Sequence, residues 1–296
     1  MKRILLLSLF LFLMFRLSCQ NFSLDGTYAF QEMSLIESMK LADGKIIFEY
    51  DLECKEKTSE IITFELKHIY GLPFLVLSKK MPMEVASWID LKKDNNIQTD
   101  NKILFLSMKD KSNITMFAYT KGYSFNESLT YTRFNERGNT FKDCSSFLVE
   151  KTKSYPVENL RNPGPDTPWV EGVSGDGIGE GFTIWVDEEN NSQKSPAPYL
   201  LIINDYISYD KPYLYKQNNR VKKLKVTGLK SGKSKILNVL DTPHPQTIDI
   251  SFIPERESLR VEIEDVYHGS KYDDTCINYL ILHTNEVIPY ENSILD

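Results

Sequence analysis

Apolar and polar residues alternate in short runs along most of this chain, and this pattern limits the fold more than any other feature. In residues 259–264, aliphatic side chains at odd positions alternate with charged side chains at even positions. A period of two is typical of a half-buried β-strand. Helical spacing predicts only two short helices, at 83–91 and at 32–41. Strands are predicted at 45–54, 62–67, 102–108, 113–120, 128–134, 182–186, 199–203, 221–226, 235–240, 247–252, 258–264 and 278–283. Without a βαβ rhythm or an internal repeat, the chain is expected to be all-β.

The length of 296 residues allows two cores, since a domain typically contains about 100–150 residues. The periodicity fades shortly before residue 145, where Gly138-Asn139 predicts a turn. We therefore expect a small β-rich barrel or sandwich domain of unknown function at 20–140. An antiparallel sandwich is expected at 144–287, followed by a C-terminal tail at 288–296.

The first residues have the pattern of an export signal. Lys2 and Arg3 precede an apolar run at 4–15 that only Ser8 interrupts. This run is too short for a transmembrane helix, although a short anchor remains the alternative, and it fits the core of a signal peptide at 1–19. The mature protein is therefore expected to be exported, to a periplasmic, outer-surface or secreted location.

The end of the signal leaves two alternatives open. Leu17-Ser18-Cys19 resembles a lipoprotein box, in which Cys19 would carry a lipid, but Arg16 stands where that pattern usually has an aliphatic residue. Ordinary cleavage beside Cys19 is the other alternative. Cys54, Cys144 and Cys276 then remain, so at least one of them must stay unpaired or pair between chains.

Signatures of catalysis are missing from the sequence. It contains no G-x-S-x-G elbow, no P-loop and no H-E-x-x-H motif, and its four His residues are scattered without metal-ligand spacing. The net charge of −6 argues against a nucleic-acid partner. We expect no enzyme, no cofactor and no catalytic residue, although a site assembled only in three dimensions stays open.

A glycine-rich segment at 169–180 predicts a tightly shaped loop beside a sheet. It combines Trp169 and Glu171 with four glycines, at positions 172, 175, 177 and 179. Glycine permits positive φ and close backbone approach. Trp169 could contact a ligand or pack in a core. Glu171, Glu180 and the pair Asp273-Asp274 could hold calcium or serve turn chemistry.

Two other segments have the composition of a binding surface. The stretch 204–215 combines four tyrosines, including Tyr206, with Asn204 and Asp205, a combination that suits stacking on a sugar ring and hydrogen bonding to its hydroxyls. Structural packing is the alternative for each tyrosine. The basic residues at 220–235 predict a solvated hairpin face or a surface for an anionic glycan or phospholipid headgroup.

An ordered series of motifs in the second half resembles a known family. These motifs are Ser145-Ser146-x-Leu148, Tyr155, Asn159-Leu160, Thr167-x-Trp169-Val170-Glu171-Gly172, Gly177-Ile178-Gly179-Glu180, 218–224, 241–248 and 265–276. Together they resemble the discoidin-like (coagulation-factor type C) domain of the NAD glycohydrolase translocation family, which serves toxin translocation and glycan binding. The resemblance implies a galactose-binding-like jelly roll in the C-terminal half. It does not extend to the glycohydrolase catalytic domain.

The resemblance also bears on metal binding. Related jelly rolls often have Asp-Gly shortly before the Thr-x-Trp motif, with a structural calcium nearby, whereas this chain has Asn162-Pro163. Structural calcium is therefore only weakly supported, and no metal ligand is assigned.

The sequence thus predicts an exported protein that binds a glycan or a similar cell-surface ligand through loops of the jelly roll, without catalysis. The predicted ligand-binding residues are Trp169, Glu171, Tyr206, Asn219 and Arg220. A membrane contact is expected only through a lipid on Cys19. One alternative is an enzyme with an unrecognised N-terminal catalytic domain that the jelly roll targets. Another is a structural envelope lipoprotein.

Overall fold

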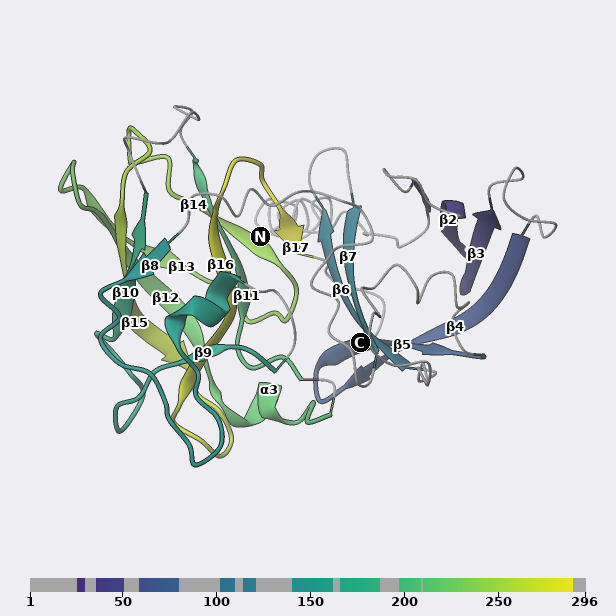
Figure 1. Cartoon of the computed structure of the whole chain (residues 1–296), viewed down its shortest axis with the longest axis horizontal. Coiled ribbons are helices and arrows are strands. Elements are labelled where there is room, and N and C mark those ends of the chain that lie inside the picture. Colours follow the sequence, from purple (N-terminus) through teal and green to yellow (C-terminus); the bar gives the residue numbers. More distant parts are fainter. Residues whose placement is uncertain are drawn as a thin grey trace, which may run out of the picture.

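The structure is a computed structural model that describes residues 26–29, 36–50, 59–79, 102–109, 114–120, 140–161, 166–186, 197–208 and 210–289. The predicted signal peptide, Cys19, Cys54, the helix at 83–91 and the strand at 128–134 lie outside these ranges. None of the described helices is long and apolar enough to cross a membrane. The described part consists mainly of β-strands, so the all-β prediction is confirmed (Figure 1).

The N-terminal half forms one antiparallel sheet. Its strands are β1 (Gly26–Ala29), β2 (Ile36–Ala42), β3 (Lys45–Tyr50), β4 (Ser59–Ile69), β5 (Leu72–Leu77), β6 (Lys102–Lys109) and β7 (Ile114–Thr120). The order is β1-β2-β3-β4-β5-β6, with β7 also paired to β6. Within the described strands the sheet stays open, so the barrel that the sequence allowed does not form here.

The predicted helix at 32–41 is wrong, because this region contains strand β2. Residues Ile36–Ala42 pair in antiparallel register with β3. The two strands are joined by Asp43-Gly44, with φ of 50° and 68°. An Asp-Gly pair with both φ positive is the preferred two-residue hairpin turn. This turn signal, rather than the side-chain spacing, determines the local structure.

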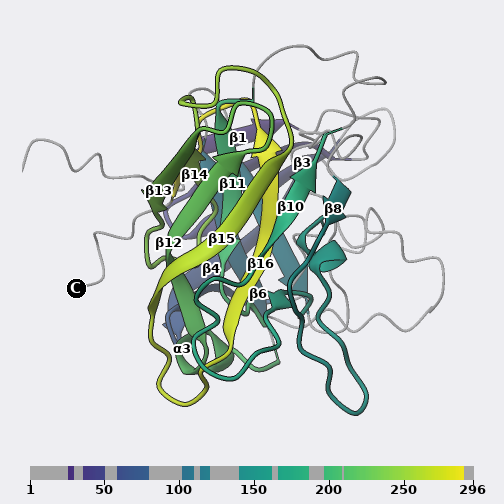
Figure 2. The ribbon, with the colours of Figure 1, turned by 90° about the vertical axis from the view of Figure 1, so that its left-hand side faces the viewer.

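The C-terminal half is a two-layered sandwich. Its elements are β8 (Thr140–Lys142), η1 (Val157–Arg161), β9 (Trp169–Val170), β10 (Gly181–Trp185), β11 (Tyr199–Asn204), α3 (Leu214–Gln217), β12 (Asn219–Gly228), β13 (Ser234–Asn238), β14 (Gln246–Asp249), β15 (Leu259–Tyr267) and β16 (Thr275–His283). One layer has the order β8-β10-β15-β12-β13 and faces the viewer in Figure 2. The other contains β14-β11-β16, with β9 on β16.

The main core lies between these layers. Alternate residues of β10, β12 and β15 contribute one side, among them Phe182, Leu224 and Val261. Leu200 of β11 and Leu280 of β16 contribute to the other side, and all five are at most 1% exposed. The layers join where Asn219–Arg220 of β12 runs parallel to Thr275–Cys276 of β16. This short junction holds the two sheets together at one end.

The outer face of β11 and β16 is buried as well. Leu201, Tyr279 and Ile281 form a second apolar cluster with Leu72 and Phe74 of β5. Beyond β16 the chain crosses to the N-terminal sheet, where β17 (Ile288–Pro289) pairs with β6. The predicted tail therefore begins as a strand of the other unit. Because the N-terminal unit covers this face, the face is closed to an external ligand.

His244 makes the stability of this arrangement sensitive to acid. It is 3% exposed on the loop between β13 and β14, and burial, with a smaller contribution from His68 of β4, lowers its pKa to about 3. The unfolded chain binds this proton below about pH 6.5, whereas the folded chain does not. Stability is therefore lost as the pH falls from 6.5 toward 3.

We expect this single group to remove about 2 kcal/mol of unfolding free energy between pH 7 and pH 5. The measurement is urea unfolding of the wild type and of His244→Gln at both pH values. The variant lacks the titrating ring, so it should lose about 2 kcal/mol less than the wild type over this interval. Parallel losses in the two proteins would contradict the assignment.

Candidate functional site

The glycine-rich segment forms the shaped loop that the sequence predicts. Gly175, Gly177 and Gly179 all have positive φ, between 66° and 98°. At Gly177 a Cβ atom would lie 2.5 Å from Cγ of Glu171, so any larger residue there would collide with the Glu171 side chain. The loop ends on β15, where the backbone N–H of Gly179 donates to the carbonyl of Ile263 at 2.8 Å. Gly177 therefore serves close packing, whereas Gly175 and Gly179 have open space around them and serve the positive φ.

Trp169 lies in the core. Its side chain is 0% exposed, and its ring meets Phe182 edge-on with centroids 5.1 Å apart. The indole Nε1–H donates to the carbonyl of Ser146 at 3.1 Å. The structure therefore contradicts the prediction that Trp169 contacts a ligand. The pairing of β9 with β16 places this ring between the sheets and away from solvent.

Glu171 and Asn219 connect loops at one end of the sandwich. The carboxylate of Glu171, 0% exposed, accepts the backbone N–H of Val173 at 2.8 Å and that of Thr275 at 3.2 Å. The side-chain amide of Asn219, 1% exposed, donates to Asp176 at 2.9 Å. The structure therefore contradicts the ligand contacts predicted for Glu171 and Asn219, because both side chains are buried and hydrogen-bonded within the chain.

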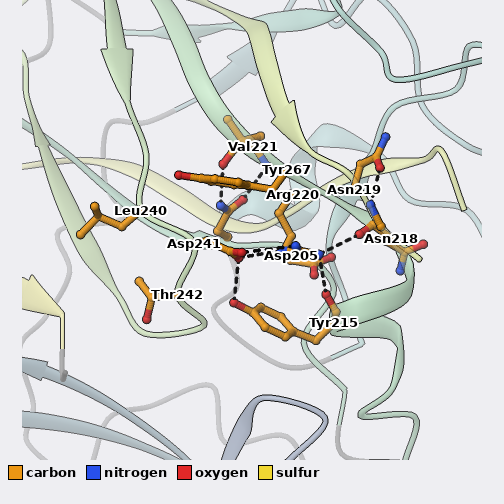
Figure 3. A network of polar contacts seen from close by, with 12 residues as sticks. Asp205, Tyr215, Asn218, Asn219, Arg220, Val221, Leu240, Asp241, Thr242 and Tyr267 are labelled. Carbon is orange, nitrogen blue, oxygen red and sulfur yellow. Dashed lines mark hydrogen bonds and ion pairs between the residues drawn. The ribbon is translucent and has the colours of Figure 1, made fainter. Parts of the chain in front are cut away.

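Arg220 lies at the centre of a buried polar network (Figure 3). Its Nε donates to Oδ1 of Asp241 at 2.6 Å, and its Nη2 donates to Oδ2 at 3.3 Å. Its Nη1 donates to the carbonyls of Tyr215 and Asn218, both at 3.2 Å. Arg220 is only 6% exposed and its guanidinium is bonded within the chain, so the structure also contradicts the ligand contact predicted for this residue. The residue attaches α3 to the sheet.

Asp205 is the most deeply buried acid in this network. It is 0% exposed and has a φ of 72°, and its Oδ1 accepts the backbone N–H of Tyr206 at 2.5 Å. Burial raises the pKa of its carboxyl well above the ordinary value, and the charge of Arg220 opposes this shift. The Arg220 guanidinium therefore pairs directly with Asp241 and acts on Asp205 through its charge.

Tyr206, unlike the other predicted site residues, lines the pocket described below. A pocket of about 220 Å³ is lined in part by Leu214 of α3, the helix labelled at the lower end of Figure 2. The ring of Tyr206 meets Tyr155 edge-on at 5.9 Å, and its hydroxyl accepts from Nζ of Lys153 at 2.9 Å. The lining residues are Leu148, Glu150, Tyr155, Val170, Tyr206, Lys211, Tyr213, Leu214, Asn218, Tyr272, Asp274 and Cys276.

Two carboxylates give this pocket hydrogen-bond acceptors. Glu150 accepts from the hydroxyl of Tyr155 at 3.1 Å. Asp274 is half-buried, and burial raises its pKa, with further contributions from the charges of Asp273 and Glu150. Burial also raises the pKa of Tyr155 and of Tyr206, so their hydroxyls keep their protons at neutral pH. Acidic acceptors beside neutral phenols suit a polyhydroxylated ligand.

Four of the lysines at 220–235 are paired with acidic side chains. The ion pairs join Lys222 and Lys223 to Asp265, Lys225 to Glu262 and Lys230 to Glu255. Hydrogen bonds from Lys222 and Lys223 lower the pKa of Asp265 to about 2. Acids on β15 and on the segment before it neutralise these four lysines. The β12–β13 hairpin therefore fits a solvated face better than an anion-binding surface.

The described ranges hold no group of three or more His, Cys, Asp and Glu side chains placed to bind a metal ion. Cys144 and Cys276 both carry free thiols in the structure. Burial raises the pKa of each thiol.

Sequence reasoning missed most of the pocket. Tyr155 and Tyr272 stand within the family motifs, and Tyr213 within the tyrosine-rich stretch, so composition gave a signal for them. Glu150 and Lys211 gave none. These residues come from three separate loops, and only the pairing of β9 and β12 with β16 brings the loops together.

Comparison with known families agrees with this architecture. A family model described as the NAD glycohydrolase translocation F5/8 type C domain matches residues 130–282, more than half of the 296-residue chain. Searches of curated proteins and of solved structures gave no match. F5/8 type C domains are jelly-roll sandwiches, which confirms the fold predicted for this half. The chain therefore belongs to the NAD glycohydrolase translocation F5/8 type C domain family.

Proposed function

We propose that this chain is an exported accessory protein that recognises a glycan in the pocket bordered by Tyr155, Tyr206 and Asp274, without catalysis. The observation that carries the proposal is the pocket itself, in which several tyrosine rings stand beside two carboxylates. Rings of this kind pack on the apolar face of a sugar, while carboxylate oxygens accept hydrogen bonds from its hydroxyls. The family description adds support, since translocation implies an accessory role.

Asp274 offers a sharp test because binding and stability should respond differently to its replacement. The surroundings of this carboxyl raise its pKa, which means that folding disfavours its charge. Asp274→Asn should therefore keep or slightly raise the melting temperature. The same change removes a charged hydrogen-bond acceptor from the pocket, and we expect binding to weaken by about tenfold or more.

The measurement is binding of the full chain to an array of immobilised oligosaccharides, followed by titration of the glycans that bind. Asp273→Asn is the matched control, because Asp273 is the neighbouring acid and its side chain is not part of the pocket lining. Failure of the wild type to bind any glycan would overturn the proposal. Equal weakening by both variants would place the site elsewhere.

The non-catalytic and exported character needs separate experiments. Incubation of the full chain with NAD, and with each glycan that it binds, should leave both unchanged. Turnover of either would favour the enzyme alternative. Mass spectrometry of the mature N-terminus should find cleavage near Cys19, and it will distinguish a lipidated Cys19 from ordinary cleavage beside it. An intact N-terminus would contradict export through this signal.

A further inference from the structure

The turn between β4 and β5 has an unusual residue for its backbone conformation. Tyr70 and Gly71 form a two-residue hairpin turn with φ of 55° and 86°. Such a turn favours Asn or Asp followed by Gly, because a bulky side chain is strained at positive φ. The same sheet follows this preference at Asp43-Gly44, where φ is 50° and 68°. Tyr70 therefore occupies its position against the local preference, a condition that often marks a functional constraint.

The ring of Tyr70 touches the jelly roll. It meets the ring of Tyr213 edge-on, with centroids 6.0 Å apart and planes at 78°. Gly71 follows closely, since a Cβ atom there would lie 2.8 Å from Cε of Lys216 and 3.3 Å from the ring of Tyr215. Tyr70 is 58% exposed, so burial alone does not explain why a tyrosine stands here. Figure 1 shows this turn beside α3.

The segment that Tyr70 contacts is a wall of the pocket. Tyr213, Leu214 and Asn218 all line it, and Leu214 also packs against the buried cluster that contains Cys276. Helix α3 has only four residues, which is too short to be stable by itself. Arg220 holds its carbonyls from the jelly-roll side. The Tyr70–Gly71 turn supports it from the N-terminal unit.

We infer that Tyr70 is a positioning residue through which the N-terminal unit holds the pocket wall at Tyr213–Asn218 in place. The ring does not line the pocket itself. It limits the outward movement of α3, and the affinity of the pocket depends on this support. The effect on affinity rests on the proposed glycan function, whereas the effect on the wall does not.

The test replaces Tyr70 with Asn, which removes the ring but suits positive φ. Because Asn is favoured in this turn, Tyr70→Asn should unfold at the same or a higher temperature than the wild type. Movement of the wall is measured as the alkylation rate of Cys276 by iodoacetamide, followed by mass spectrometry of its tryptic peptide. We expect this rate to rise about three- to tenfold, the factor that corresponds to loss of one aromatic pair.

Two controls separate this effect from general loosening. Cys144 lies on a different tryptic peptide and packs beside the main core, so its alkylation rate should stay unchanged in the same sample. Asp43→Asn changes the equivalent turn between β2 and β3 and should leave the rate at Cys276 unaltered. An unchanged rate at Cys276 in Tyr70→Asn, or equal acceleration at both cysteines, would overturn the inference.

The glycan array then distinguishes the two proposals. Tyr70→Asn should weaken binding of each glycan that the wild type binds, by a factor similar to the gain in alkylation rate. Faster alkylation of Cys276 in a protein that binds no glycan would support the wall but overturn the glycan function. An unchanged alkylation rate of Cys276 in a protein that binds glycans would support the glycan function but overturn the role of Tyr70 in holding the wall.

Discussion

Trp169→Ala is expected to lower the free energy of unfolding by about 3–5 kcal/mol, the range for removing a fully buried large aromatic ring. The ring is 0% exposed, packs edge-on against Phe182 and donates its indole N–H to Ser146. Its removal leaves a cavity between the two sheets and takes one of the two donors from the carbonyl of Ser146, which keeps the thiol of Cys144 at 3.0 Å. Urea unfolding followed by circular dichroism measures the loss.

Trp169→Phe is the matched control, because it keeps an aromatic ring between the sheets. It should be destabilised less than the alanine variant, since most of the cavity stays filled. Glycan binding by the phenylalanine variant should stay close to that of the wild type at a temperature where both are folded. Lost binding with an unchanged melting temperature would mean that Trp169 contacts the ligand after all.

The second large effect is expected at Arg220. Arg220→Met should cost about 3 kcal/mol of stability near neutral pH, because it leaves two buried or half-buried carboxylates without their cation. These are Asp241, which Arg220 contacts at 2.6 Å, and the fully buried Asp205. The substitution also frees the carbonyls of Tyr215 and Asn218, so α3 loses its attachment to the sheet.

The pH dependence identifies the cause of this loss. Arg220 favours the charged form of Asp205, so its removal raises the pKa of that carboxyl further. Protonation then relieves the uncompensated charge, and the destabilisation relative to wild type should be smaller at pH 5 than at pH 7. The double variant Arg220→Met, Asp205→Asn should recover part of the loss at pH 7. A loss that is the same at both pH values and in both variants would indicate packing rather than charge.

The sequence predicted the strands well because their signal is local. In β15, alternation between aliphatic and charged residues reports directly which face meets the core, and the structure has the strand at Leu259–Tyr267. At 32–41 the spacing predicted a helix, which was wrong, because the Asp43-Gly44 turn pairs Ile36–Ala42 with β3 as strand β2. Strand β16 shows no alternation of apolar and polar residues, because both of its faces are covered and residues 275–282 are all buried.

The candidate site was harder to predict, because the residue types that suit a ligand also suit a buried network. Trp169, Glu171, Asn219 and Arg220 have the right chemistry, yet each has its polar atoms bonded within the chain. Tyr206 alone of the predicted set borders the pocket. Burial depends on which loops meet, and no local pattern in the sequence records that.

By itself, the sequence determined the β-strand content, the family of the C-terminal half and the shaped glycine loop, because backbone periodicity and turn chemistry act between near neighbours. Only the tertiary structure decided which side chains border the pocket. It also decided that the N-terminal sheet covers β11 and β16 and reaches α3 through Tyr70. Those contacts join residues more than 100 positions apart, so they arise from the docking of the two units rather than from local preference.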